Sequence, residues 1–412
     1  MKKLISILVA FAMMAALAVT ATFAAVPQTT ALADAVLTKT YQTPDGVVAP
    51  EADFKFKFDV ATGSNADTPA VGVQTIHFDS KTTGGEQVGY KNLGEIFTVT
   101  GEQGRIALPH AGTYIYTITE NNDEATINPS TWAKAGSTTD AEAIDFSEAS
   151  YTLRIYVKNG ATAGSLAIQA ITVEKVLDDE GNPNTATEKK VLPNKPTGEN
   201  AKSGWEYKNV YSKTIIPPTG DTNGAFNVQK TVVGTNADKT TQFNFKGKIT
   251  IPSTMVKDAA QTFEASYPNG KTAVFTVAAN ATESDEVEFK LADGQKLVFA
   301  TFPAGAKFAI TETLNAQTAI QYNDKYTKAA AVKENSTTPI TVTSAAPGVD
   351  LATVVGAINA QEAVTVTNTL PEDTVTPEGI LISNLPYIAL ALVAIGGLVA
   401  YVVVRRRNAD EA

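Results

Sequence analysis

Two halves of this 412-residue chain repeat the same three residue types in the same order. Each half has a Lys in its first strand-like run, a Glu at the end of a later run and an Asn in its last run. The two sets are Lys39, Glu120 and Asn209, and Lys230, Glu312 and Asn368. The Lys and the Glu are 81 residues apart in the first set and 82 in the second. Chance rarely preserves both order and spacing, so the pattern predicts a tandem repeat.

If these side chains meet inside a core, they could form an amide bond without a cofactor. Desolvation disfavours charge, which lowers the pKa of a Lys and raises that of a Glu. A neutral Lys amine could attack the Asn side-chain carbon, while a protonated Glu hydrogen-bonds to the Asn carbonyl and carries protons. Ammonia would leave and a covalent cross-link would remain. The alternative is that the Lys and Glu side chains are ordinary surface charges and the Asn belongs to a turn.

The segments that carry these residues are typical of β-strands. Apolar and polar residues alternate through Phe54–Phe58 and Thr113–Thr119, and clusters of Gly, Pro, Asn and Asp separate such runs. No long segment with helical periodicity competes, so we expect an all-β sandwich fold. A sandwich can place its first and last strands side by side, which would bring the Lys and the Asn together.

The repeat and the two chain ends predict seven segments. These are a signal peptide (1–33), a first domain (34–214), a linker (215–224), a second domain (225–370), a Pro-containing segment before the apolar stretch (371–379), a transmembrane helix (380–404) and a cytoplasmic tail (405–412).

The N-terminal segment has a basic start, Met1–Lys3, and then an apolar, Ala-rich run. This is the pattern of a secretory signal peptide. Cleavage could follow residues 24–25 or the Ala-x-Ala pattern that ends at Ala33. The alternative is an N-terminal anchor that is retained.

The C-terminal segment combines an apolar stretch, Pro386–Val404, with the basic cluster Arg405–Arg407. The stretch is long enough to cross a bilayer as a helix. The positive charges favour a cytoplasmic location for the tail. The two ends together predict a protein that is exported and then held at the membrane by its tail.

The composition excludes several functional classes. The formal net charge is -10, and an acidic surface repels phosphate backbones, so nucleic acid is not an expected partner. The absence of Cys excludes disulfides, thiolate catalysis and zinc–thiolate sites. Neither His77 nor His110 has neighbours at the spacing of a metal site or a catalytic triad. We therefore expect no cofactor, no metal and no enzymatic activity beyond self-cross-linking.

The acidic segment Asp178–Asn182 follows a strand-like run at 171–177. A Ca²⁺ loop is one interpretation, but the ligand spacing of known loops is missing. A hairpin turn is the favoured interpretation.

The segment before the apolar C-terminal stretch resembles the pentapeptide sorting signals that sortases cleave. It consists of Val375, Thr376, Pro377, Glu378 and Gly379. The resemblance implies cleavage between Glu378 and Gly379, although Glu378 stands where the family has Thr. Leu370–Thr374 is a rival signal, and Ile216–Gly220 in the linker is similar but has no apolar span after it. A plain membrane anchor preceded by a linker is the alternative.

The chain as a whole resembles the two-domain major pilins of streptococci and related Gram-positive bacteria. The strongest stretches are Phe226–Phe245, Asp293–Glu312 and Val364–Ile395. The resemblance implies two immunoglobulin-like sandwiches, each closed by a self-formed Lys–Asn isopeptide bond beside a Glu. Carried over, the bonds would join Lys39 to Asn209 and Lys230 to Asn368, with Glu120 and Glu312 as the catalytic acids.

The same resemblance implies covalent polymerisation at the cell surface. A pilin-class sortase would join the sorting signal of one subunit to a Lys of the next, for which Lys202 matches best and Lys195 and Lys208 are alternatives. Expected partners are this sortase, a housekeeping sortase that anchors the polymer to the cell wall, other copies of the chain, ancillary pilins and host surface ligands. A non-polymerising adhesin or ancillary pilin is the alternative function.

Overall fold

Alternating apolar side chains form the strands of both domains in this computed structural model. The structure describes residues 29–81, 84–128, 133–134, 142–194, 197–198, 200–313, 326–334, 341–347 and 349–371. In β2 (Glu51–Val60), Phe54, Phe56 and Phe58 are buried, whereas Lys57 between them is exposed. This alternation is the period-2 pattern of a strand with one face in a core. Nearly all regular structure in the described ranges is β, which confirms the expected all-β class.

The first domain consists of two main sheets. Their strand orders are β4-β1-β14-β10-β9 and β13-β12-β11-β7-β2-β3, with β8 pairing to β2. The elements are η1 (Leu32–Asp34), β1 (Val36–Thr43), β2, β3 (Gln74–Phe78), β4 (Gly85–Asn92), α2 (Leu93–Ile96), β5 (Phe97–Thr98), β6 (Ile106–Ala107), β7 (Gly112–Glu120), β8 (Thr126–Asn128), β9 (Ala133–Lys134), β10 (Glu142–Asp145), β11 (Ser150–Asn159), β12 (Leu166–Leu177), β13 (Lys190–Val191) and β14 (Glu206–Ile215).

The second domain also consists of two sheets. Their strand orders are β18-β17-β20-β15-β26-β23-β24 and β19-β16-β22-β25. The elements are β15 (Phe226–Val233), β16 (Phe243–Thr250), η2 (Ser253–Met255), β17 (Gln261–Tyr267), β18 (Lys271–Val277), β19 (Val287–Leu291), β20 (Lys296–Phe299), β21 (Phe302–Pro303), β22 (Ala306–Thr313), β23 (Thr327–Glu334), β24 (Thr341–Ala345), β25 (Leu351–Ile358) and β26 (Glu362–Thr369).

The first and last strands of each domain are parallel neighbours. β1 pairs with β14 in the first domain, and β15 pairs with β26 in the second. Both β1 and β15 are buried along most of their length. The sandwich thus provides the side-by-side first and last strands that the repeat requires.

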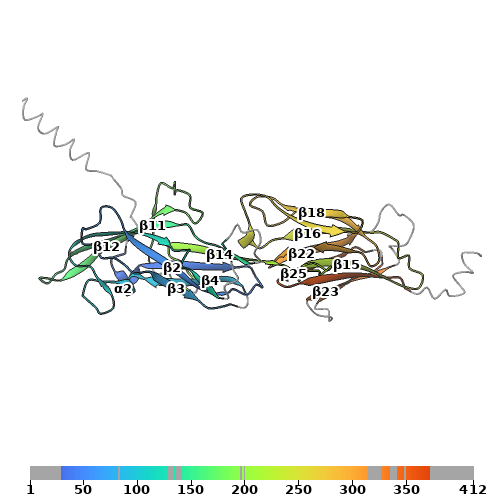
Figure 1. Ribbon diagram of the computed structural model, residues 1–412, viewed down its shortest axis with the longest axis horizontal. Helices are drawn as coiled ribbons and strands as arrows, with labels where there is room; N and C mark the ends of the chain where they lie inside the picture. Colours follow the sequence, from blue (N-terminus) through green and yellow to red (C-terminus); the bar gives the residue numbers. More distant parts are fainter. Residues whose placement is uncertain are drawn as a thin grey trace, which may run out of the picture.

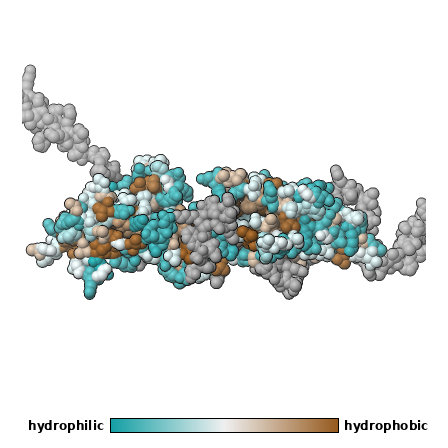
Figure 2. All heavy atoms as spheres, in the orientation of Figure 1, coloured by the Kyte–Doolittle hydropathy of each residue, from teal (hydrophilic) through white to brown (hydrophobic). Residues whose placement is uncertain are grey.

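The two domains lie end to end along the long axis of the molecule (Figure 1). Strand β14 of the first domain also pairs with β21, so that Thr214 lies opposite Pro303 and Ile215 opposite Phe302. Ile215, the first residue of the predicted linker, is therefore the last residue of a strand. Figure 2 shows that the visible face is largely hydrophilic, with apolar side chains in scattered patches over both domains.

A glycine brings the turn before β22 close to the first domain. Gly305 has φ +83°, a left-handed conformation that favours glycine. A Cβ at this position would lie 2.8 Å from Pro44 Cβ and 3.1 Å from the backbone oxygen of Asp45. The close approach of the two domains here depends on the missing side chain.

Candidate functional site

The first domain buries a lysine, a glutamate and an asparagine in one contact. Lys39 lies in β1, Glu120 is the last residue of β7, and Asn209 lies in β14. Lys39 Nζ donates a hydrogen bond to Glu120 Oε2 at 2.6 Å, and Asn209 Nδ2 donates to Glu120 Oε1 at 2.7 Å. The Lys39 and Glu120 side chains are 0% exposed, as is Asn209. One carboxyl group therefore bridges the amine and the carboxamide.

The second domain contains the same arrangement. Lys230 lies in β15, Glu312 in β22 and Asn368 in β26. Lys230 Nζ donates to Glu312 Oε2 at 2.9 Å, and Asn368 Nδ2 donates to Glu312 Oε1 at 2.6 Å. All three residues are buried. The structure thus brings together all three predicted residues in each domain, out of contact with solvent.

The strand register explains why the lysine and the asparagine meet. In the first domain Lys39 is opposite Tyr207, and Asn209, two residues further along β14, is opposite Tyr41. Residues two apart on a strand share a face of the sheet, so Lys39 and Asn209 are diagonal neighbours on the inner face.

The second domain repeats this offset between its parallel strands. Lys230 is opposite Val366, and Asn368 is opposite Val232. The lysine and the asparagine are therefore offset by two residues in the same way in both domains.

Aromatic rings lie close to both buried amines. Lys39 Nζ lies 4.7 Å from the ring centroid of Phe54. Lys230 Nζ lies 4.4 Å from that of Phe243 and 5.8 Å from that of Phe245. Rings favour a nearby cation but do not replace the hydration that an ammonium group loses on burial.

This burial shifts the protonation of the lysines and of Glu120. Desolvation lowers the pKa of Lys39, although the Glu120 carboxylate raises it in part. Desolvation likewise raises the pKa of Glu120, opposed by Lys39. In the second domain, desolvation lowers the pKa of Lys230 to about 8, against the opposing effect of Glu312. Burial therefore favours the neutral, nucleophilic form of both amines.

The orientation of the carboxamide differs from the one expected from sequence. The expected mechanism has a protonated Glu donating to the Asn carbonyl. In the structure the Asn NH₂ group donates to the Glu in both domains. Because the second carboxyl oxygen contacts the Lys amine, the Glu is placed to move a proton from Nζ to the departing nitrogen. Polarisation of the carbonyl must come from another group.

Comparisons with known proteins return pilus proteins and one uncharacterised domain family. Residues 224–369 match a family described as "Domain of unknown function (DUF7601)". No curated protein matches the chain. Solved structures similar to it include two of the major pilin from Streptococcus pyogenes. The first is a point mutant of that pilin, with 17% identity over 82% of this chain and 99% of that chain and a TM-score of 0.29. The second has 18% identity over 82% and 98%, with a TM-score of 0.29.

A solved pilus-presented adhesin, Spy0125, is also similar. It has 11% identity over 80% of this chain and 99% of that chain, with a TM-score of 0.24. TM-scores of this size do not establish a shared fold.

The three lysines predicted as candidates for joining subunits have different surroundings. Lys202 is exposed and forms ion pairs with Glu86 and with Glu206, the latter at 3.1 Å. Partial burial lowers the pKa of Lys202, but the hydrogen bonds to the two carboxylates outweigh it and leave the pKa raised. Lys208 is exposed on β14. Lys195 lies outside the described residues.

Most of the predicted targeting segments also lie outside the described residues. These are residues 1–28 of the signal peptide, the sorting signal Val375–Gly379 and the apolar C-terminal stretch. Within the described ranges, no helix has the length and hydrophobicity needed to span a bilayer. In the same ranges, no group of three or more His, Cys, Asp or Glu residues is arranged to hold a metal ion.

Sequence reasoning missed three residues that surround the two sites. The backbone N–H of Ser147 donates to Asn209 Oδ1 at 2.7 Å, and Asp179 in the acidic turn accepts a hydrogen bond from the Ser147 hydroxyl. In the second domain, Lys328 is 1% exposed and pairs directly opposite Asn368 across β23 and β26. No side chain marks a backbone N–H donor, so the contact of Ser147 could not be predicted from sequence. The acidic turn that contains Asp179 could be predicted from the sequence, but its contact with Ser147 could not.

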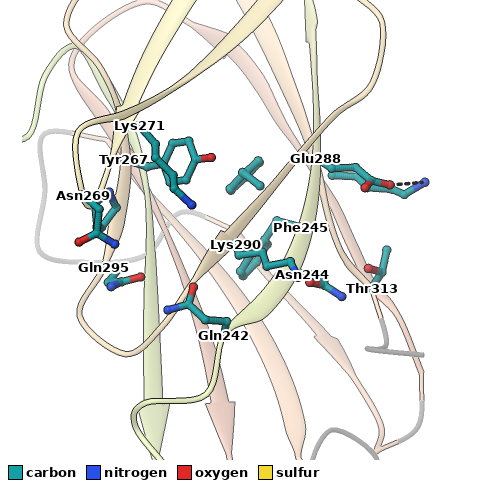
Figure 3. Close-up of a pocket in the computed structure, with 13 residues that line it drawn as sticks. Gln242, Asn244, Phe245, Tyr267, Asn269, Lys271, Glu288, Lys290, Gln295 and Thr313 are labelled. Atoms are coloured by element: carbon teal, nitrogen blue, oxygen red, sulfur yellow. Dashed lines mark ion pairs between the residues drawn. The ribbon is translucent and has the colours of Figure 1, made fainter. Parts of the chain in front are cut away.

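A separate cavity of about 610 Å³ lies on the second domain, between β16, β18 and β19. Figure 3 shows Tyr267, Lys271 and Lys290 among its lining side chains. Phe245 also lines it, but Lys230, Glu312 and Asn368 do not. The cavity therefore adjoins the buried site of Lys230, Glu312 and Asn368 without containing it.

Proposed function

We propose that this chain is a structural subunit of a covalently polymerised pilus on the surface of a Gram-positive bacterium, stabilised by one self-formed Lys–Asn amide bond in each domain. The observation that carries the proposal is the duplicated, water-excluded contact of Lys, Glu and Asn between the first and last strands. The sequence features at the two ends support export and sortase processing.

The burial of the two lysines supports the bond itself. A buried ammonium group is costly even when it is paired, because the pair loses the hydration of both charges. Amide formation removes the lysine charge and leaves a neutral Glu carboxyl or a released proton in its place. It also replaces a hydrogen-bonded contact with a covalent one. The reaction is therefore favoured by the same desolvation that makes the amine nucleophilic.

The position of the bond suits a fibre that carries load. The chain enters each domain through the first strand and leaves through the last, and these strands are parallel neighbours. Pulling on the two ends would shear this pair. A bond between Lys39 and Asn209 would transmit force directly between the two strands. The remaining strands of the domain would bear little of that force.

Polymerisation is the second part of the proposal. A pilin-class sortase would cleave after Glu378 and join its carbonyl to Lys202 of the next subunit, with Lys195 and Lys208 as alternatives. Lys202 is accessible, and the carboxylates that pair with it keep its amine at a defined place beside the last strand of the first domain. A housekeeping sortase would then attach the polymer to the cell wall.

The mass of the denatured full chain tests the internal bonds. Each bond releases ammonia, so one bond lowers the mass by about 17 Da and two lower it by about 34 Da. Lys39→Met and Lys230→Met should each abolish one loss, and peptide mapping should find Lys39 joined to Asn209 and Lys230 to Asn368. Lys57→Met, at an exposed position between buried neighbours on β2, serves as the matched control and should keep both losses. A wild-type mass equal to that of the translated sequence would contradict the proposal.

Extracts of the cell wall test polymerisation separately. A ladder of covalent multimers containing a Lys202–Glu378 amide is expected for a shaft subunit, and Lys202→Arg should abolish it while leaving both internal bonds. A single anchored species in wild-type cells would instead support the adhesin or ancillary pilin. A ladder that persists in Lys202→Arg and is lost in Lys208→Arg would reassign the joining lysine.

A further inference from the structure

The carboxamide oxygen of Asn209 has a dedicated hydrogen-bond donor. The backbone N–H of Ser147 lies 2.7 Å from Asn209 Oδ1, and Ser147 is 1% exposed. A backbone N–H can only donate, so it fixes which end of the carboxamide faces Ser147 and which faces Glu120. This oxygen is the atom on which negative charge develops when an amine attacks the adjacent carbon.

The hairpin turn after β12 holds Ser147 in place. The Ser147 hydroxyl donates to Asp179 Oδ1 at 2.5 Å, and the Glu148 N–H donates to the Asp179 backbone oxygen at 2.9 Å. The same Asp179 Oδ1 accepts the backbone N–H of Lys208, the neighbour of Asn209, at 3.0 Å. Asp179 therefore ties the Ser147 segment to β14, which carries the reacting asparagine.

The second domain lacks such a donor in the part that the structure describes. Asn368 Oδ1 is buried and has no hydrogen-bond partner among these residues. Its NH₂ group contacts Glu312 just as that of Asn209 contacts Glu120. Among the described residues, a donor to the carboxamide oxygen is thus found at the first site and not at the second.

We propose that the Ser147 backbone N–H is a catalytic group for the Lys39–Asn209 bond, and that Asp179 is its positioning residue. This inference rests on the proposed function. As Lys39 Nζ bonds to Asn209 Cγ, the carbonyl electron pair moves to Oδ1, where the N–H stabilises it. Glu120 transfers one proton from Nζ to Nδ2, the Cγ–Nδ2 bond breaks, and ammonia leaves. The carbonyl re-forms as an amide, with atoms and charge balanced.

A time course of bond formation tests this inference. The full chain is made by cell-free translation in detergent, translation is stopped, and samples are denatured in acid at intervals for intact-mass measurement and peptide mapping. The two bonds are followed in the same molecules, so the second-domain bond reports on general folding. Ser147→Pro removes the N–H, and the first-domain bond should form about 100-fold more slowly, the effect of removing one oxyanion donor in an enzyme. The rate of the second-domain bond should not change.

Two variants of Asp179 keep the test decisive if the proline disturbs the fold. Asp179→Ala removes the acceptor of both Ser147 and Lys208 and should slow the first bond at least several-fold. Asp179→Asn retains an oxygen acceptor and should restore most of the rate, which a purely electrostatic role of the carboxylate would not. Lys175→Met, which removes the amine 3.5 Å from Asp179 Oδ2, is the matched control and should leave the rate unchanged.

The outcomes separate this inference from the proposed function. A wild-type chain that forms neither bond contradicts the proposed function itself. A first-domain rate in folded Ser147→Pro equal to that of the wild type overturns the inference alone. Equal slowing of both bonds, or an Asp179→Asn rate as low as that of Asp179→Ala, also overturns it, because the effect would then come from folding or from charge.

Discussion

The two domains place the same three side chains in the same contact but differ in the charges around them. In the first domain, burial lowers the pKa of Lys39, and the carboxylates of Glu120, Asp179 and Glu206 oppose this shift. Burial also raises the pKa of Glu120, and the Asp179 carboxylate adds to that shift. In the second domain, burial lowers the pKa of Lys230; Glu312 and Asp293 oppose this shift, and the buried neighbour Lys328 adds to it. Lys328 Nζ donates to the backbone oxygen of Val349 at 2.8 Å.

These neighbours would promote the proposed reaction at different points. A negative neighbour favours the protonated acid at the first site and opposes deprotonation of its amine. The Ser147 N–H compensates by stabilising the oxygen that becomes negative. A positive neighbour favours the neutral amine at the second site, where Asn368 Oδ1 has no described donor. The same arrangement of three residues can thus be made more reactive in two ways, either by stabilising the carbonyl oxygen or by lowering the pKa of the amine.

Substituting the glutamates should produce the largest effect and should act on one domain at a time. Glu120→Gln retains a side chain that can hydrogen-bond to Asn209 but cannot accept the proton of Lys39. The first bond should not form, and the mass loss should fall from about 34 Da to about 17 Da. Glu312→Gln should do the same for the second bond. Each altered domain should lose about 4–5 kcal/mol of unfolding free energy, the value for a cross-link that closes a loop of 100 residues or more.

Intact mass and urea unfolding of the full chain measure both quantities. Glu95→Gln, on the short helix α2, changes an exposed carboxylate and serves as the control. A Glu120→Gln chain that still loses about 34 Da would show that the carboxyl is not required at the first site. The two domains would then not share one mechanism of bond formation.

The sequence was sufficient to predict the all-β class and to identify the residues that the structure brings together at the two buried sites, because both depend on local patterns. Alternation identifies strands such as β2 and β7, and the repeated order identifies the two sets of Lys, Glu and Asn. The surroundings could not be predicted in this way. The contact of Ser147 with Asn209 depends on a backbone atom in the β10–β11 connection. The pairing of Lys328 with Asn368 depends on β23 and β26 being neighbours, which no local pattern specifies.

Removing the buried cation of the second domain should have an intermediate effect. Only the neutral amine attacks, and the pKa of Lys230 is about 8. The second bond should therefore form faster as the pH rises towards 8 and reach a constant rate above it. Lys328→Met keeps an unbranched side chain of similar length but removes the charge. The pKa of Lys230 should rise, so the rate profile should shift to higher pH and the rate at pH 7 should fall a few-fold.

The time course of ammonia loss after cell-free translation at several pH values measures this shift. The first-domain bond in the same chain is the internal control, because Lys328 lies in the other domain. A profile for Lys328→Met that coincides with that of the wild type would show that the neighbouring cation does not tune the second site. An equal shift in both domains would contradict the assignment to Lys328.

The smallest effect is expected at the surface of the first domain, where a lysine is also paired with glutamates but in contact with water. Glu86→Gln removes one of the two carboxylates paired with Lys202. Exposed ion pairs contribute little because solvent already stabilises both charges, so the unfolding free energy should change by less than about 1 kcal/mol. Both internal bonds should form at the wild-type rate.

Since Glu86 raises the pKa of Lys202, the variant should have a lower pKa at this amine, which chemical labelling of Lys202 against pH would measure. A loss of stability as large as that of Glu120→Gln would mean that burial is not what separates the cross-linking lysines from this one.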